Sequence, residues 1–428
     1  MRDRLRESLR NIKRDALAGT ITGMMAVPLT VGICMMSKYP VKTGIYTVIF
    51  AGFISFMTYL FRPGNYTGMP GVAAGLAPAL ALGVDTFGIH NMPFVILLTS
   101  LFQAIVWRYQ LERYILRLVP PYLVEGLLAG VGLKIAMKFF PFLYDVEHKT
   151  AVWLNFEREV VLVLSVVSFI GFVLLYRIYH RKIPALPYVV ILMTSVALSF
   201  FFTLPMINVE NVPFHLALPL PDFSGLTHQG ALWMFTKMFV FALMLGTIDI
   251  IEQVMSHVAI VRMDPQKREA NTNNGLLAIW LANIGATSFG GMTNLDGLAK
   301  SSTNTIAGAQ TKLSNVFTSL TLFGVVLFPV VLEHMPEYAL GIIMVYSGWK
   351  MISNLRHVKE SGRYAMVLSG LCGVLVYQLG IFEGLLITLF IHSCSQFILQ
   401  KQTGKSSREI LRIFAERLRD QKTTSSLS

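Results

Sequence analysis

Long apolar runs separated by short polar segments follow one another along almost the whole chain. A helix needs about 20 apolar residues to cross the hydrocarbon core, and fewer where it is broken. We predict about fourteen spans on this basis, at roughly 16–36, 44–61, 71–83, 91–108, 121–143, 159–177, 186–204, 232–256, 273–290, 297–308, 313–332, 337–350, 364–380 and 382–399. With 54% hydrophobic and 14% charged residues, the pattern predicts an all-α polytopic membrane protein.

The third and tenth predicted spans are short and follow glycine-rich turns, TGMPG at 67–71 and GGMTN at 290–294. They hold the same position in two halves of seven, which predicts a 7+7 inverted repeat with half-helices at spans 3 and 10. Their amino ends would then meet near the membrane midplane. Each offers unpaired N–H groups and about half a positive charge, which suits an anion. Two ordinary short spans with glycine at packing contacts are the alternative.

The net charge of +12 comes from short basic clusters beside apolar runs. This distribution indicates membrane topology and predicts no nucleic-acid partner. With both termini cytoplasmic, the inner loops receive most of the basic residues, Lys312 among them, and the long outer loop 205–230 contains no Lys or Arg. We therefore predict a protein of the cell inner membrane with the bilayer around it and both termini inside.

Residues 1–14 are predicted as a cytoplasmic amphipathic segment, and the tail 401–428 as a cytoplasmic tail with an amphipathic helix at about 405–421. The three cysteines fall in apolar segments without metal-ligand spacing, which argues against disulfides and zinc. We find no phosphate-binding Gly-Lys loop and no nucleophile triad, so neither ATP-driven transport nor an enzyme is predicted. No cofactor is expected, apart from Na⁺ or H⁺ as a coupling ion.

The stretch from Leu281 to Gln310 carries Asp296 and Lys300 at predicted membrane depth. A charge at the bilayer centre costs about 2.5–3.5 kcal/mol on insertion scales, so the pair predicts a solute or ion path. The spacing i, i+4 favours an ion pair on one helix. Three roles stay open for Asp296: N-cap of the tenth span, shield of Lys300 in the empty site, or proton or cation ligand.

Polar groups also share one face of the eighth predicted span. Asp249, Glu252, Gln253 and Ser256 are spaced i, i+3, i+4 and i+7. Their oxygens could hold Na⁺ at Asp249, or a carboxyl group there could carry H⁺. Alternatively, Glu252 lies near cytoplasmic water and Asp249 hydrogen-bonds a neighbouring helix. Thr30, after the helix-breaking Pro28, is predicted to line the core cavity that this face of the eighth span should border. The alternative is a hydrogen bond from its hydroxyl to a carbonyl of its own helix.

Five strings in order resemble the sulfate permease (SulP) family of anion transporters: DALAGTITGMMAVP at 15–28, PVKTGIYTVIFAGFISFMTYLF at 40–61, the turn at 65–74, VPPYLVEGLLAGVGLKI at 119–135 and LANIGATSFGG at 281–291. The resemblance implies a core domain of spans 1–4 and 8–11 and a gate domain of spans 5–7 and 12–14. It further implies rocking of one domain against the other and a homodimer. The family's cytoplasmic STAS domain is not expected in this chain, nor regulation through it.

The resemblance also gives domain bounds and site residues. The core is expected at 15–110 and 232–333, the gate at 111–204 and 334–400, and an extracellular loop at 205–231. The family's substrate site corresponds to Gly71, Val72 and Ala73 at the third span and to Gly297, Leu298, Ala299 and Lys300 at the tenth. Lys300 stands where the family usually has Arg, which removes the planar two-point fork. Asp296 replaces a small or hydroxyl residue, and Asp249 matches an acidic position that is Asp in sodium-coupled bicarbonate transporters.

The sequence thus predicts a secondary active transporter of a small anion of the sulfate, bicarbonate, chloride or dicarboxylate class. Transport would occur by alternating access, coupled to Na⁺ or H⁺ through Asp249. One alternative is a nucleobase-type proton symporter of the same fold, although the position of that family's carboxylate is Ala299 here. The other alternative is a membrane scaffold or sensor that does not transport.

Overall fold

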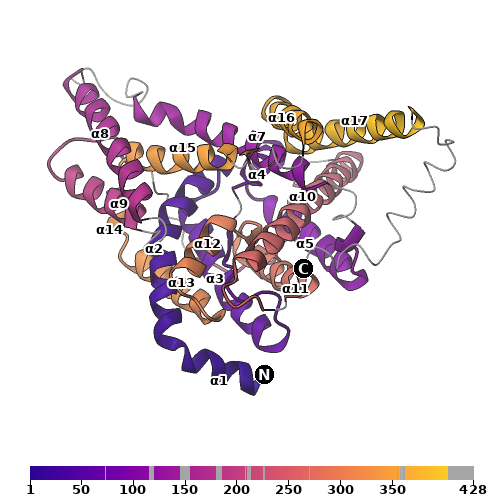
Figure 1. The fold of residues 1–428 in the computed structure, drawn as a ribbon, viewed down its shortest axis with the longest axis horizontal. Helices are drawn as coiled ribbons and strands as arrows, with labels where there is room; N and C mark the ends of the chain where they lie inside the picture. Colours follow the sequence, from indigo (N-terminus) through magenta and orange to yellow (C-terminus); the bar gives the residue numbers. More distant parts are fainter. Residues whose placement is uncertain are drawn as a thin grey trace.

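The computed structural model describes residues 1–72, 74–114, 120–144, 155–179, 186–207, 209, 214–224, 227–268, 270–353, 355–356, 358 and 362–402. The predicted tail helix at 405–421 and the predicted site residue Ala73 lie outside these residues. The described part is built of packed helices (Figure 1).

Each of the predicted spans overlaps a helix of the described residues. The helices are α1 (Arg2–Arg10), α2 (Ile12–Ser37), α3 (Val41–Phe61), α4 (Ala77–Phe87), α5 (Met92–Tyr109), α7 (Pro121–Phe139), α8 (Asn155–Tyr179), α9 (Leu186–Ser199), α10 (His228–Met263), α11 (Thr272–Ala286), α12 (Leu298–Ile306), α13 (Leu313–Leu327), α14 (Val330–Glu333), α15 (Glu337–Ser353), α16 (Arg363–Gln378) and α17 (Ile381–Gln402). Among the described residues, six helices are long and apolar enough to cross a membrane, and shorter apolar helices accompany them.

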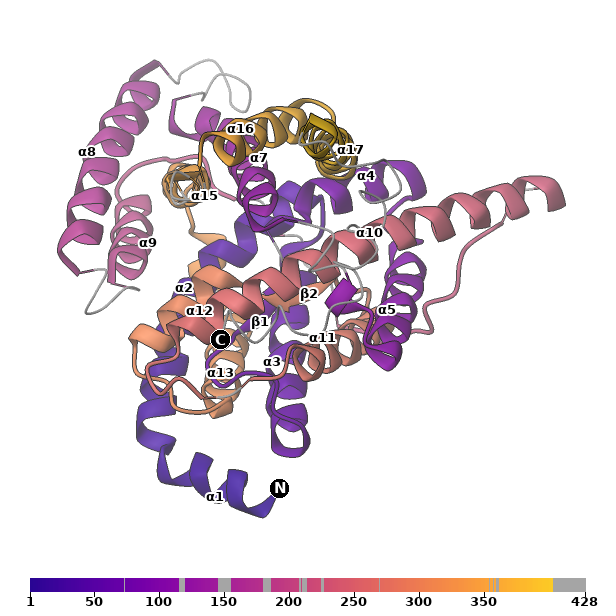
Figure 2. The same cartoon turned by 45° about the vertical axis from the view of Figure 1, so that its right-hand side comes forward.

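A short antiparallel sheet was not predicted. Strand β1 (Pro70–Val72) pairs with β2 (Asn294–Asp296), and the strands precede the short helices α4 and α12. Figure 2 shows the strand pair near the centre of the molecule, where β1 contacts α3 and β2 contacts α10 and α11. A break in a helix leaves backbone N–H and C=O groups without partners, and in an apolar interior each of these is costly. The two broken segments satisfy one another, which is why extended chain is stable here.

The helices pack in two sets. Helix α2 packs against α4, α12 and α13, α3 against α11 and α13, and α5 against α10 and α11. In the other set, α7 packs against α15 and α16, α16 against α17, and α8 against α9. Figure 1 shows α7, α15, α16 and α17 across the upper part of the molecule and α3, α12 and α13 below them.

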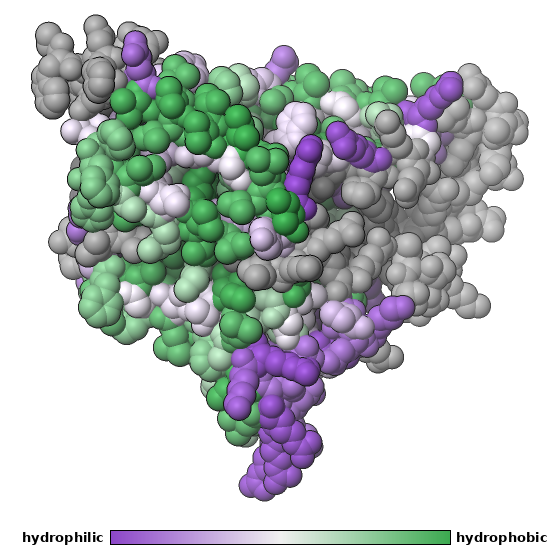
Figure 3. Space-filling model, turned by 60° about the vertical axis from the view of Figure 1, so that its left-hand side comes forward, coloured by the Kyte–Doolittle hydropathy of each residue, from purple (hydrophilic) through white to green (hydrophobic). Residues whose placement is uncertain are grey.

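The surface combines a broad apolar area with a polar tip. Figure 3 shows hydrophobic side chains over much of one face and a hydrophilic projection at the bottom, where Figure 1 places α1. Helix α8 exposes Val163, Val167 and Ile178 by 61%, 62% and 65%. Soluble monomers rarely expose apolar patches on this scale, whereas a bilayer requires them.

Candidate functional site

The strand pair brings the starts of α4 and α12 together. Gly71 lies opposite Leu295 and Pro70 opposite Asp296 in the antiparallel register. The pairing continues past β2, because the N–H of Gly297 donates to the carbonyl of Met69 at 3.0 Å. Segments more than 200 residues apart in sequence are thus joined residue by residue. The predicted site residues Gly71, Val72 and Gly297 lie at this junction.

Lys300, in the first turn of α12, places a buried ammonium group at the junction. Its side chain is 4% exposed, and Nζ has no hydrogen-bond partner among the described residues. Nζ lies against Gly71, where an added Cβ would overlap it, and a Cβ on Gly297 would come within 2.9 Å of Lys300 Cε. Gly71 also has a φ of +155°, which favours glycine. The two glycines therefore make the space that the lysine occupies, and a buried donor without a partner makes Lys300 a candidate ligand-binding group.

The structure corrects two predictions about Asp296. Asp296 lies on β2 and not on the helix of Lys300, so the two do not form an i, i+4 helical ion pair. The N-cap of α12 is Gly297, without a side-chain capping bond, so the N-cap role is wrong as well. The sequence could not show that Asp296 lies in a strand, because three residues of extended chain between Gly291 and Gly297 resemble the start of a helix.

Asp296 pairs with Lys312 instead. Its Oδ1 lies 3.6 Å from Lys312 Nζ, and its Oδ2 accepts a 2.7 Å hydrogen bond from Asn65 Nδ2. Lys312 also donates to the carbonyl of Gly68 at 2.5 Å and is 4% exposed. Lys312 lies in the turn between α12 and α13, where the sequence predicted an inner loop, but its side chain is buried beside Asp296. The carboxylate of Asp296 thus pairs with Lys312, and it also attracts the ammonium of Lys300 without a hydrogen bond between them, so the shield role stays open.

Gln253 and His257 of α10 complete the surroundings of Asp296. Gln253 accepts a 2.7 Å bond from the backbone N–H of Asp296 through Oε1, and its Nε2 lies 3.4 Å from Oδ2. His257 Nδ1 is 3.3 Å from Asn65 Nδ2. Gln253, predicted with the cation-coupling group, thus holds β2. Asn65, His257 and Lys312 were not selected from the sequence, because their link to Asp296 is purely tertiary.

Asp249 is fully buried and connects α10 to β2. Its Oδ2 accepts from Gln103 Nε2 at 2.8 Å and from Asn283 Nδ2 at 3.4 Å. Asn283 Oδ1 in turn accepts a 2.6 Å bond from the N–H of Asn294 in β2. Asp249 Oδ1 and Asn294 Oδ1 have no hydrogen-bond partner among the described residues. Asp249 therefore bonds neighbouring helices, as one alternative held, and still keeps one free acceptor.

Glu252 and Thr30 take no part in the hydrogen bonds described above, although the carboxylate of Glu252 is close enough to Asp249 to repel its charge. Glu252 lies against the turn before α4, where a Cβ on Gly75 would overlap its Oε2. Thr30 is buried, and its Oγ1 has no hydrogen-bond partner among the described residues, so the structure does not show back-bonding to its own helix.

A cavity of about 360 Å³ opens along α12. It is bounded by Met25 of α2, Tyr176 of α8, Tyr188 of α9, Ala299 and Ser302 of α12, and Lys350 of α15. Ala299 is exposed, whereas Leu298 and Gly297 are half-buried and Lys300 lies buried behind them. The amino end of α12 is thus reached through the cavity.

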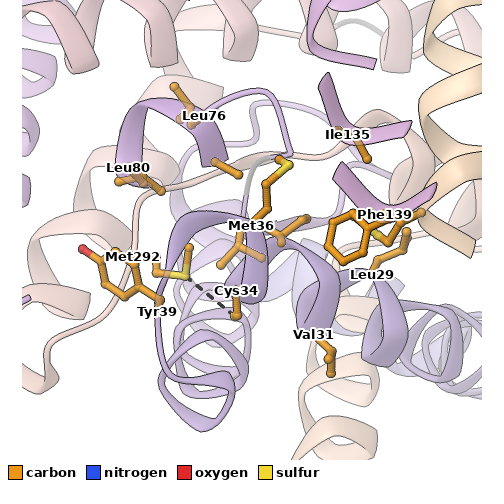
Figure 4. Packing of buried hydrophobic residues seen from close by; sticks show 14 of the residues in the cluster. Leu29, Val31, Cys34, Met36, Tyr39, Leu76, Leu80, Ile135, Phe139 and Met292 are labelled. Atoms are coloured by element: carbon orange, nitrogen blue, oxygen red, sulfur yellow. Dashed lines mark hydrogen bonds between the residues drawn. The ribbon is translucent and has the colours of Figure 1, made fainter. Parts of the chain in front are cut away.

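The carboxyl half of α2 packs against α7. We call this the sealed contact and define it by Leu29, Met36, Ile135, Lys138 and Phe139. Figure 4 shows Phe139 of α7 beside Leu29 of α2, both buried in the same apolar cluster. Lys138 Nζ donates to the carbonyls of Met35 and Met36 at 3.3 and 3.1 Å. These carbonyls belong to the last turn of α2, where a cation is favourable.

Comparisons with known proteins agree with this architecture. The family model described as "Sulfate permease family" matches residues 12–368. The "Putative sulfate transporter YvdB" of Bacillus subtilis (strain 168) is 24% identical over 415 residues, covering 91% of this chain and 75% of that protein. The "Bicarbonate transporter BicA" of Synechocystis sp. is 21% identical over 434 residues, covering 94% and 74%.

Solved structures with the same fold include two anion transporters at low identity. The transmembrane domain of a cyanobacterium bicarbonate transporter BicA has a TM-score of 0.69 at 18% identity, covering 88% of this chain and 97% of that chain. SLC26A9 has a TM-score of 0.72 at 13% identity, covering 91% and 66%. At these identities the likeness shows the fold, that of a largely helical, multi-pass membrane transporter.

Proposed function

The chain belongs to the sulfate permease family, and from that premise we propose that it is a secondary transporter of a small anion. The observation that carries the proposal is the buried ammonium of Lys300, which has no partner among the described residues and lies where β1, β2 and the start of α12 meet. A helix amino end adds unpaired N–H groups and a positive potential at the same place. An anion there would satisfy both. The family's relatives are transporters, and the chain is accordingly not an enzyme.

The charge balance supports an anionic substrate. Among the described residues, the carboxylate of Asp296 serves two buried ammonium groups, Lys312 at 3.6 Å and Lys300, which it attracts without a hydrogen bond, so the group carries an excess of positive charge. A lysine makes point contacts rather than the planar two-point contact of arginine. We therefore propose sulfate, bicarbonate, chloride or a small dicarboxylate as the substrate class. Relatives are named as putative sulfate and as bicarbonate transporters.

We propose alternating access between a core domain at 15–110 and 232–333 and a gate domain at 111–204 and 334–400. The packing of α2–α5 with α10–α13 and of α7 with α15 and α16 supports this division. In this proposal the short helices α4 and α12 are the half-helices of a 7+7 repeat and move with the core. We also propose that the protein is a homodimer in the cell inner membrane and that both of its termini are cytoplasmic.

Cation coupling through Asp249 is part of the same proposal. Na⁺ binds oxygen ligands, and Asp249 Oδ1 and Asn294 Oδ1 are buried acceptors without partners among the described residues. A proton on Asp249 would satisfy one of them equally well. Because Asn283 links Asp249 to the backbone of Asn294, either cation would bias the position of β2 and hence of the anion site.

No observation favours the nucleobase symporter or the scaffold. The carboxylate of Asp296 is occupied by Lys312 and Asn65, so it is not a free partner for a nucleobase. The cavity that reaches Ala299 supports a solute path.

The test is uptake into liposomes. The purified protein should take up at least one of labelled sulfate, bicarbonate, chloride or fumarate, and Lys300→Gln should reduce that uptake at least tenfold. Lys237→Gln is the matched control, since Lys237 is exposed on α10, and it should transport like the wild type. Uptake of uracil with no uptake of any anion would overturn the proposal.

A further inference from the structure

We propose that the cavity holds a second anion-binding subsite at Lys350, in front of the site at Lys300. This inference deepens the proposed function and rests on it. The ligand would be a hydrated oxyanion, either an inorganic one such as sulfate or a small carboxylate.

The charge of the lining favours an anion. The described residues that line the cavity include Lys350 and no acidic residue. Lys350 Nζ donates to the hydroxyl of Tyr176 at 2.6 Å and lies 5.2 Å from the centre of that ring. The hydrogen bond and the ring hold the ammonium at one edge of the cavity, whereas a lysine without such contacts would extend into water in many conformations. The cation keeps two further N–H donors for a ligand.

Hydroxyl groups supply the other donors. Tyr346 and Ser302 line the same cavity, and the ring of Tyr346 lies 4.9 Å from that of Tyr176. Ser353 lines it as well, but its hydroxyl donates to the carbonyl of Lys350 at 2.7 Å. An oxyanion has several acceptor oxygens, and an ammonium together with hydroxyls can satisfy them. A volume of about 360 Å³ leaves room for the anion with part of its water. The lining therefore suits a hydrated ion, whereas Lys300 is buried.

The subsite lies on the way to Lys300. Ala299, Ser302 and Ile306 are spaced i, i+3 and i+7, so they share the face of α12 that borders the cavity. Lys300 is buried behind that face. An anion that enters beside Lys350 follows α12 to its amino end. A fixed cation at the mouth raises the local anion concentration and should act mainly on KM.

The simplest competing role for Lys350 is a contact with lipid headgroups. Lys350 is exposed near the end of α15, and long lysine side chains commonly extend toward the interface. In that case its charge would have no influence on the reactivity of a group inside the cavity. The experiment below separates the two roles without depending on transport.

A cysteine on the cavity face of α12 reports the local charge. We would place Ser302→Cys in a Cys394→Ser background, because Cys34 and Cys372 are buried. In detergent, the reaction rates of the anionic sulfonatoethyl and the cationic trimethylammonioethyl methanethiosulfonate are compared. We expect the anionic reagent to be favoured, Lys350→Gln to lower that preference severalfold, and Lys350→Arg to keep it. Lys237→Gln is the control and should leave the preference unchanged.

Sulfate protection separates the two sites. Labelling of Ser302→Cys should be slower in sulfate than in chloride at the same ionic strength. This protection should persist when Lys300→Gln is added and should be lost when Lys350→Gln is added. An unreactive cysteine, or a preference that Lys350→Gln does not change, would overturn the subsite. Protection lost with Lys300→Gln alone would place the anion only at Lys300, which refutes the subsite and leaves the proposed function intact. Protection that persists in both variants would also refute it.

Discussion

Two neighbouring regions of α2, its middle and its carboxyl half, meet the surrounding helices in opposite ways. Toward its carboxyl end, Leu29 lies beside Phe139 of α7 and Lys138 binds the last carbonyls (Figure 4). Met25, one turn before Leu29 in the middle of α2, faces the cavity. One helix thus contributes to a closed contact and to an open space. In the proposed transport cycle, such a difference would leave the site open to one side only, since the packed region of α2 is closed and the region at Met25 is open.

The chemistry of the two regions differs as well. The sealed contact is apolar, with Ile135 and Phe139 exposed by 1% and 0%, and its one cation, Lys138, sits on a helix end. The cavity is lined by hydroxyls and Lys350. Separating the sealed contact requires water to cover both of its apolar surfaces, whereas the polar lining of the cavity can already bind water. We infer that the sealed contact sets the balance between the two states of the proposed transport cycle.

The largest effect should come from Phe139→Ala. Truncating a buried Phe costs about 3–5 kcal/mol, and much of that loss falls on the sealed contact. A Leu29→Cys reporter in a Cys394→Ser background should then react with a maleimide at least tenfold faster. Phe140→Ala is the control, because Phe140 is 50% exposed and should leave the rate unchanged. Equal rates for the two variants would mean that the sealed contact does not hold the state.

A smaller effect is expected from Lys138→Gln. A cation at a helix carboxyl end is worth about 0.3–1 kcal/mol, so the same reporter should react about two- to fivefold faster. Lys138→Arg should restore the slow rate, since the arginine can bind the same carbonyls. If Lys138→Gln changes the rate as much as Phe139→Ala, then the charge and not the packing closes this side.

The smallest effect on stability is expected from the ion pair of Asp264 and Arg268, which binds the segment just after α12. Asp264 Oδ2 accepts a 2.9 Å bond from Arg268 Nε, and Arg268 Nη1 donates at 2.6 Å to the carbonyl of Gln310, just after α12. Burial acts to raise the pKa of Asp264, but the bonds from Arg268 and from the N–H of Gln266 outweigh it and hold the pKa below 3.8. A lowered pKa in the fold stabilises the protein above pH 3.8 and ceases to do so as the pH falls further.

We therefore expect Asp264→Asn to lower the Tm slightly at pH 7 and the difference from the wild type to shrink below pH 4. Thermal unfolding at a series of pH values measures this. The cavity reporter Ser302→Cys should react at a changed rate in Asp264→Asn, and the sealed reporter Leu29→Cys should not. A difference in Tm that grows on acidification would contradict the assignment.

The sequence located the segments better than it located their contacts. Apolar length and the glycine-rich turns indicated where α4 and α12 begin, because those properties are local. The same turns hid the strand pair, since β1 and β2 are each only three residues and depend on one another. Lys300 was selected because a charge in an apolar segment is costly wherever it lies.

The sequence alone did not predict which side chains contact Asp296 and Asp249. Lys312 was assigned to a loop by its position between apolar runs, yet it is buried beside Asp296. Asn65 and His257 are ordinary polar residues in the sequence and reach Asp296 only after three segments have packed. Asp249 was selected, but its bonds to Gln103 and Asn283 come from other helices. Each of these contacts depends on how helices cross, which local periodicity does not encode.

The central claim is that Lys300 is held without a partner so that an anion can bind it. Thermal unfolding of the wild type and Lys300→Met, each with and without sulfate, bicarbonate, chloride and fumarate, tests this most directly. An unpaired buried charge destabilises the empty protein, so Lys300→Met should raise the Tm without ligand by a few degrees and abolish the rise that an anion gives the wild type. A lower Tm for Lys300→Met together with an undiminished rise on adding the anion would contradict the account.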